Sequence, residues 1–221
     1  MEFRSWATAL PSFIEVIAVQ LPGRGLRFGE PSITIMDDLI DSLLREVSGM
    51  LDRPLALFGH SLGGRIAFAF AERLSVVGVQ APPIVVVSAS RPPGRMGKHD
   101  FNTFTDADLR RYIMQLGGTA PEIVLNNEMA DLMLPVIRAD YSLHESISTP
   151  SYKLNCPVIA CGGIDDCTVS EADLRAWAEL TSSSFELRLF PGGHFYLREV
   201  THKLLSFMAE RFQMRIVEAY K

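Results

Sequence analysis

The chain has 221 residues, a mass of 24.5 kDa and a formal net charge of −5. This length fits one domain with a sizeable core, and 48% apolar with 21% charged residues is ordinary for a globular protein. The acidic balance and the lack of a densely basic stretch argue against nucleic acid as a partner. No apolar signal core and no membrane-spanning apolar run is present, so we expect a cytoplasmic monomer that does not bind membranes.

Five short apolar runs predict strands, and four segments with helical spacing alternate with them. The strands are expected at residues 14–19, 55–58, 84–88, 158–161 and 186–190. The helices are expected at residues 35–51, 64–74, 171–180 and 201–220. Continuous Val and Ile runs are typical of strands buried on both faces, as in a parallel sheet. The fold class is therefore predicted as α/β, with a mostly parallel sheet flanked by helices.

Residues 98–150 break this alternation, since they contain two or three helical stretches and no expected strand. Leu109, Ile113 and Leu116 recur at helical spacing, and Pro135 is expected to kink or start a helix. We expect residues 1–97 and 151–221 to form the core and residues 98–150 to form a helical lid over it. The alternative is an ordinary crossover made of several helices.

Three cysteines, Cys156, Cys161 and Cys167, cannot all pair with one another and do not show the spacing of a zinc site. They are expected to be small buried thiols in a reducing compartment. We expect no metal and no cofactor.

The heptapeptide from Phe58 to Gly64 carries the most specific chemical signal in the chain. Within it, Gly59-His60-Ser61-Leu62-Gly63 matches G-x-S-x-G between an apolar run and a helical pattern, which is the context of a nucleophile elbow. Glycines are needed there because two backbone segments crowd together and the serine is strained. Ser61 is predicted to be a nucleophile, the alternative being a structural turn serine.

A serine nucleophile needs a base and an acid. In hydrolases with this type of elbow, the acid and then the histidine follow the serine along the chain. His194 follows the last expected strand on a glycine-containing loop, where open α/β sheets carry their sites. Asp165 and Asp166 follow the preceding strand, and Asp166 is preferred because it starts an Asp-x-x-Val pattern. The backbone N–H of Leu62 is expected to form part of an oxyanion hole.

With these motifs the chain resembles the type II thioesterases that accompany nonribosomal peptide and polyketide synthases, and the related medium-chain fatty-acyl thioesterases. The resemblance runs nearly end to end, through segments beginning at Gln20, Phe58, Gln115, Pro135 and Pro191. It implies an α/β-hydrolase fold, an Asp166 acid, and hydrolysis of acyl groups from the phosphopantetheine arms of acyl or peptidyl carrier proteins. Met114, Met129 and Met133 would then line an adaptable acyl pocket or form the core of the lid.

The resemblance differs at the N-terminus, where the family carries a further strand and an "FPxAGG" loop that supplies a second oxyanion donor. This sequence enters the pattern only at Phe3-Arg4-Ser5-Trp6-Ala7. We therefore expect the chain as written to be poorly active or unstable, which full turnover with cooperative melting would disprove.

Two other functions remain open from the sequence. One is an esterase acting on free small esters, because a serine triad does not distinguish oxygen from sulfur leaving groups. The other is a catalytically weak hydrolase fold that binds a carrier protein. Basic residues near the expected lid are candidates to meet an acidic carrier, namely Arg91, Arg95, Lys98, Arg110 and Arg111.

Overall fold

The computed structural model describes residues 2–51, 53–80, 82–95, 101–147, 150 and 153–219. Its sheet has four parallel strands in the order β1-β2-β3-β4. They are β1 (Leu57–His60), β2 (Val85–Ser88), β3 (Val158–Gly163) and β4 (Phe185–Phe190). Because the strands are parallel, their carboxyl ends meet at one edge of the sheet, and the functional residues predicted from the sequence follow β1, β3 and β4 there.

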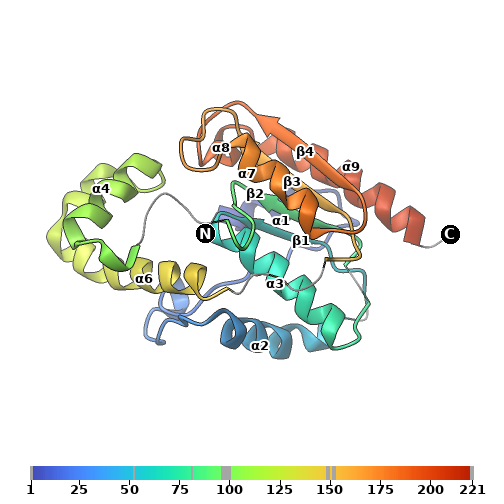
Figure 1. The fold of residues 1–221 in the computed structure, drawn as a ribbon, viewed down its shortest axis with the longest axis horizontal. Coiled ribbons are helices and arrows are strands. Elements are labelled where there is room, and N and C mark those ends of the chain that lie inside the picture. Colours follow the sequence, from blue (N-terminus) through green and yellow to red (C-terminus); the bar gives the residue numbers. More distant parts are fainter. Residues whose placement is uncertain are drawn as a thin grey trace.

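Helices cover both faces of this sheet (Figure 1). One face packs against α9 (Thr201–Ala219) and the short α1 (Trp6–Ala9). The other packs against α3 (Leu62–Val76), α7 (Glu171–Arg175) and the 3₁₀ helix η5 (Ala176–Leu180). The mostly parallel sheet flanked by helices is therefore confirmed.

Outside this sandwich, α2 (Met36–Val47) packs against α3 through Leu39 and Ile40. The remaining short helices of the core are η1 (Glu2–Ser5), η2 (Gly25–Arg27), η3 (Ser48–Met50) and α8 (Tyr196–Glu199).

Strand β2 explains why the sheet lies at the centre of the protein. All four of its residues are buried, and successive side chains point to opposite faces. Val86 packs on the α9 face, whereas Val85 and Val87 pack on the α3 face. Each fully buried valine stabilises the fold by about 1.5–3 kcal/mol relative to an exposed one.

The expected strand at residues 14–19 is wrong. This segment has no strand assignment, and no residue of it pairs with the sheet within the part of the chain that the structure describes. Ile14 and Val16 pack on the core, but Ile17 and Val19 are 44% and 55% exposed. A strand needs a backbone ladder, which side-chain pattern alone does not provide.

Residues 101–147 form a helical segment between β2 and β3. It contains η4 (Phe101–Thr103), α4 (Asp106–Leu116), α5 (Pro121–Leu125) and α6 (Asn127–Glu145), and it lies beyond one end of the sheet in Figure 1. Its local signals are strong, since Thr105 and Asp108 form a capping box and Gly117 ends α4 with a φ of 73°. Leu109, Ile113, Val124, Ala130 and Leu134 form a cluster of buried residues. The expected boundaries at residues 97/98 and 150/151 fall on residues outside the described ranges.

Three smaller expectations need adjustment. Pro135 lies inside α6 and not at its start, so this long helix tolerates the lost hydrogen bond. The helix expected at residues 171–180 is divided into α7 and η5, because α7 ends in a 3₁₀ turn. Cys167 is exposed, although Cys156 and Cys161 are buried as expected.

Within the described residues, no helix is long and apolar enough to cross a membrane.

Candidate active site

Ser61 lies at the sharp turn between β1 and α3. Its φ of 54° and ψ of −119° lie in a region that residues other than glycine rarely adopt. The Ser61 N–H donates to the carbonyl of Ser88 on the neighbouring strand at 2.7 Å, which helps to hold this conformation. A strained serine above the carboxyl end of a central strand is the geometry of a nucleophile elbow.

Close backbone approach makes glycine necessary at two positions around this turn. A Cβ added to Gly59 would lie 1.8 Å from the carbonyl oxygen of Gly63. A Cβ added to Gly64 would lie 2.7 Å from the Cβ of Ser90. At Gly63 an added Cβ would meet nothing within 4 Å, so the crowded position after the serine is Gly64.

The structure brings together the three side chains predicted as a triad. His194 follows β4, and its Nε2 lies 3.1 Å from the Oγ of Ser61. Its Nδ1 lies 2.8 Å from the Oδ2 of Asp166, in the loop after β3. A neutral His194 that donates from Nδ1 to Asp166 keeps a lone pair on Nε2 to accept the Ser61 proton. His194 and Asp166 have side chains only 7% and 1% exposed, so water competes little for this pair.

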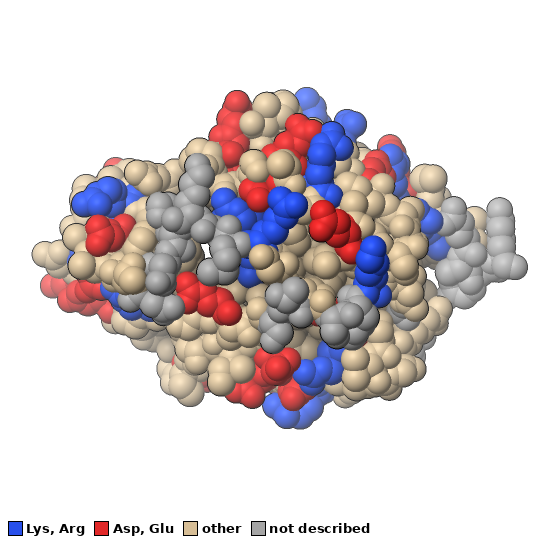
Figure 2. Space-filling view, viewed as in Figure 1, with Lys and Arg blue, Asp and Glu red and all other residues tan. Residues whose placement is uncertain are grey.

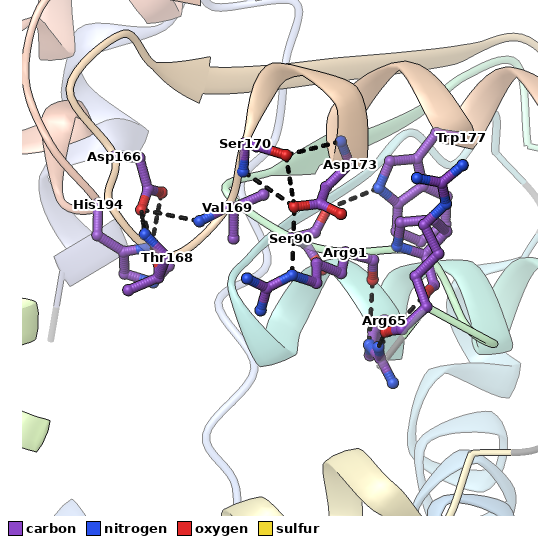
Figure 3. A network of polar contacts seen from close by, with 12 residues as sticks. Arg65, Ser90, Arg91, Asp166, Thr168, Val169, Ser170, Asp173, Trp177 and His194 are labelled. Atoms are coloured by element: carbon purple, nitrogen blue, oxygen red, sulfur yellow. Dashed lines mark hydrogen bonds and ion pairs between the residues drawn. The ribbon is translucent and has the colours of Figure 1, made fainter. Parts of the chain in front are cut away.

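Asp166 accepts more hydrogen bonds than the one from His194. Its Oδ1 accepts from the backbone N–H of Thr168 at 2.8 Å, from the Thr168 hydroxyl at 2.7 Å and from the Val169 N–H at 3.1 Å. Burial opposes ionisation of Asp166, but the hydrogen bond and charge of His194, with the Thr168 hydrogen bonds, outweigh it and lower its pKa to about 2. Asp166 is therefore a carboxylate at neutral pH. Figure 3 shows Asp166, Thr168 and His194 gathered in this contact.

The neighbouring Asp165 does not take part in this contact. It is exposed, and its backbone N–H donates to the carbonyl of Gly192 at 3.0 Å. A Cβ on Gly163 would lie 2.2 Å from the carbonyl oxygen of Gly193, so the loops after β3 and β4 touch. This close packing aligns Asp166 with the loop that carries His194.

A polar network beneath the triad was not anticipated from the sequence. The His60 Nδ1 lies 3.0 Å from the Ser88 hydroxyl, which lies 2.7 Å from the hydroxyl of Tyr196. The His60 ring centroid is 5.2 Å from that of His194. Burial, followed by the His194 charge, lowers the pKa of His60 to about 3, so this imidazole is neutral near the triad. Only the register of β1 with β2, which pairs His60 with Ser88, brings the two residues together.

Leu62 is the first residue of α3, so its backbone N–H has no acceptor one turn earlier in the helix. The helix N-terminus also carries a partial positive charge. Both features suit stabilisation of negative charge developing on a carbonyl oxygen bound beside Ser61.

The helical segment borders the site on the side of His194. A Cβ added to Gly118 would lie 2.3 Å from the ring of Phe195, the residue after His194, so backbone packs on that ring. Arg198 donates to the Gly118 carbonyl at 3.1 Å and lies over Phe195 at 4.6 Å. Burial raises the pKa of Tyr112 in α4.

The basic residues suggested as a carrier contact are engaged within the protein. Arg91 pairs with Asp173 at 3.3 Å, Arg95 with Glu179 at 3.8 Å and Arg111 with Asp108 at 3.0 Å. Arg110 donates to the carbonyl of Val124, and Lys98 lies outside the described residues. In the view of Figure 2, basic and acidic side chains are interspersed over the surface.

The three methionines suggested for an acyl pocket have different environments. Met133 packs against the cluster of buried residues in the helical segment, whereas Met114 and Met129 are 41% and 45% exposed. In the described part of the chain, no group of three or more His, Cys, Asp or Glu is arranged to hold a metal ion.

Comparison with known proteins gives a consistent result. Residues 1–212 match the model of the thioesterase domain family. The gramicidin S biosynthesis protein GrsT of Aneurinibacillus migulanus is 33% identical over 222 residues, covering 99% of this chain and 86% of that protein.

Solved structures agree. RedJ, the thioesterase from the prodiginine biosynthetic pathway of Streptomyces coelicolor, superposes with a TM-score of 0.87 at 33% identity, covering 95% of this chain and 84% of that one. BorB, a type II thioesterase from the borrelidin biosynthetic cluster, gives a TM-score of 0.84 at 35% identity, covering 95% and 86%. The expected α/β-hydrolase fold and the resemblance to type II thioesterases are thereby confirmed. The chain belongs to the thioesterase domain family and is a thioester hydrolase of the serine hydrolase class.

Proposed function

We propose that this thioesterase uses Ser61 as nucleophile, His194 as general base and acid, and Asp166 to orient His194, and that it releases acyl groups from phosphopantetheine arms of acyl or peptidyl carrier proteins. The observation that carries the assignment of roles is the hydrogen-bonded chain from the Ser61 Oγ through His194 to Asp166 at a strained elbow.

The reaction follows from this geometry. The Ser61 proton moves to the Nε2 of His194 as Oγ attacks the thioester carbonyl, giving a tetrahedral intermediate whose oxyanion the Leu62 N–H stabilises. The carbon–sulfur bond then breaks, and His194 returns the proton to the leaving thiolate. In the second half, His194 takes a proton from water, which attacks the acyl–serine ester. The carboxylic acid leaves and Ser61 regains its proton.

The carrier-protein substrate is supported by relatives such as GrsT, named for gramicidin S biosynthesis, and ClbQ, named for the colibactin NRPS/PKS pathway. We further propose that residues 1–97 and 151–221 form the catalytic core and residues 98–150 a lid over the substrate. The packing of Gly118 on Phe195, next to His194, supports this role of the helical segment. The unpaired thiols of the three cysteines favour a reducing cytoplasm as the site of action.

The test compares hydrolysis of an acyl-pantetheine thioester with that of the oxygen ester carrying the same acyl group, for the wild-type chain and Ser61→Ala. We expect the thioester to have the larger kcat/KM by at least about tenfold, and Ser61→Ala to lower kcat by about a thousandfold or more. A preference for the oxygen ester would point to an esterase.

A second arm uses an acylated carrier protein in place of the free pantetheine thioester. We expect a lower KM for the acylated carrier, since protein contacts add to those of the arm. Binding of the carrier without turnover and without labelling of Ser61 by a fluorophosphonate would indicate a non-catalytic binding fold and overturn the proposal.

A further inference from the structure

Arg65 is a buried arginine that the triad chemistry does not use. It lies in the first turn of α3, four positions after Ser61, and is only 4% exposed. Lysine and arginine are rarely buried to this extent unless their charge is satisfied by partners. The partners of Arg65 therefore indicate why it is retained there.

The Arg65 side chain donates four hydrogen bonds to main-chain carbonyls within the described residues. Its Nε donates to Arg91 at 3.1 Å, and its Nη2 donates to Pro92 and Arg95, each at 3.2 Å. Its Nη1 donates to His144 at 3.0 Å. Figure 3 shows the guanidinium of Arg65 beneath the main chain of Arg91.

These acceptors lie at the two ends of the helical segment. Arg91, Pro92 and Arg95 lie on the loop after β2, before the segment begins, and His144 lies in the last turn of α6. The carbonyls of a last helical turn carry partial negative charge, which favours a cation there. Burial, with the Arg91 charge, lowers the pKa of Arg65 to about 10, so the side chain remains a cation at neutral pH.

We propose that Arg65 is a positioning residue that ties both ends of the helical segment to the helix of the nucleophile, and so fixes how far the segment stands from Ser61. This inference rests on the proposed function, because it gives the segment a role in holding the acyl chain. A planar guanidinium with five donors can bond carbonyls on two separate stretches of chain at once, whereas a lysine ammonium offers its three donors from a single nitrogen.

The experiment compares Arg65→Lys with the matched control Arg73→Lys. Arg73 lies two turns further along α3, where it pairs with the exposed side chains of Asp37 and Asp41. Each variant is assayed with acetyl- and decanoyl-pantetheine. For Arg65→Lys we expect kcat/KM for the decanoyl substrate to fall about tenfold, mainly through KM, and that for the acetyl substrate to fall by less than about threefold.

The control variant is expected to stay within about twofold of the wild type for both substrates. An equal loss for both substrates in Arg65→Lys, or no loss, would overturn the inference. If the wild-type chain hydrolyses neither thioester, the proposed function fails instead. The two failures are therefore distinguishable.

Hydrogen exchange in the wild-type protein tests the same role of the Arg65 hydrogen bonds, and this measurement does not require a variant to fold. In the wild type we expect residues 91–95 and 140–147 to open together with the first turn of α3, with equal free energies of opening, because one guanidinium joins them. In Arg65→Lys, exchange should rise at both ends of the segment and stay unchanged in β2 and β3. Independent opening of the two ends in the wild type would contradict the inference.

Discussion

The carboxyl edge of the sheet and the helical segment beside it are built in different ways. At the sheet edge, Ser61, Asp166 and His194 are held by backbone hydrogen bonds and by loops in contact with one another. The helical segment has its own cluster of buried residues. It meets the rest of the protein through the packing of Leu143 in α6 against α2 and α3, and through individual hydrogen bonds and ion pairs. The comparison suggests that the sheet edge fixes the chemistry, whereas the segment sets which acyl chains reach it.

The polar contacts that join the helical segment to the rest of the protein differ in how deeply they are buried. Arg65 is 4% exposed and bonds four carbonyls, whereas the Arg24–Asp140 pair has side chains 32% and 26% exposed. Arg24 makes two hydrogen bonds to the carboxylate of Asp140 in α6. Water and salt reach this pair more easily than they reach Arg65.

The largest expected effect concerns the sheet edge. Asp166→Asn should lower kcat by about 10³–10⁴-fold, because the amide no longer favours the His194 tautomer that accepts the Ser61 proton. Hydrogen exchange in residues 101–147 should stay unchanged, since the hydrogen bonds of Asp166 go to Thr168, Val169 and His194, which lie outside that segment. Steady-state kinetics and exchange on the same sample check both statements. Altered exchange throughout the segment would show that the two regions are not separable.

Acid should destabilise both regions through one buried histidine in each. Burial is the main cause that lowers the pKa values of both His60 and His144 to about 3. The charge of His194 lowers the pKa of His60 further, and the charges of Arg65 and Arg91 lower that of His144. Below pH about 6.5 the unfolded chain binds protons at these sites that the folded chain does not, so the free energy of unfolding decreases as the pH falls toward 3. The two sites together give a slope of at most about 2.7 kcal/mol per pH unit.

Denaturant unfolding between pH 7 and 4 measures that slope. His60→Asn and His144→Asn should each reduce the slope by up to about 1.4 kcal/mol per pH unit, which corresponds to one proton. The double variant should reduce the slope by the sum of the two effects. A slope unchanged in both single variants would contradict the assignment of acid sensitivity to these two residues.

A smaller effect is expected at Thr168, whose hydroxyl lies 2.7 Å from the Asp166 Oδ1 and 3.0 Å from the His194 Nδ1. Thr168→Val keeps the side-chain shape but removes this donor, so the pKa of Asp166 should rise and kcat should fall by about tenfold. Thr168→Ser retains the hydroxyl and is the control, with activity expected near that of the wild type. Equal losses in both variants would indicate a packing defect instead.

The smallest effect is expected for the partly exposed ion pair between Arg24 and Asp140. Arg24→Ala should destabilise the protein by about 1 kcal/mol or less, and the loss should shrink as salt is raised. The matched variant Asp140→Ala should behave alike, and the double variant should cost little more than either single one. Thermal melts at low and high salt check this. Additive losses would show that the two residues do not act as a pair.

Much of this site could be predicted from the sequence because its signals are local. The elbow motif marks Ser61, and the chain order of a serine triad directs attention to the loops after the last two strands, where Asp166 and His194 lie. Strands β2 and β3 were recognisable as continuous apolar runs, since both of their faces are covered by helices.

The features that were missed depend on pairing between distant segments. Arg65 looks like an ordinary exposed arginine on a helix, and only the tertiary structure surrounds it with carbonyls from residues 91–95 and from His144. Ser88 gave no signal, because its contact with His60 depends on strand register. The error at residues 14–19 has the same origin, since strand formation depends on a partner that the local pattern does not specify.

The most direct test of the central claim is to locate the acyl group during turnover. The chain is mixed with decanoyl-pantetheine, quenched within milliseconds, and analysed by mass spectrometry of the intact protein and its peptides. The account predicts one decanoyl group, attached to Ser61, and none in Ser61→Ala. Hydrolysis without any acylated protein, or acylation at a residue other than Ser61, would contradict it.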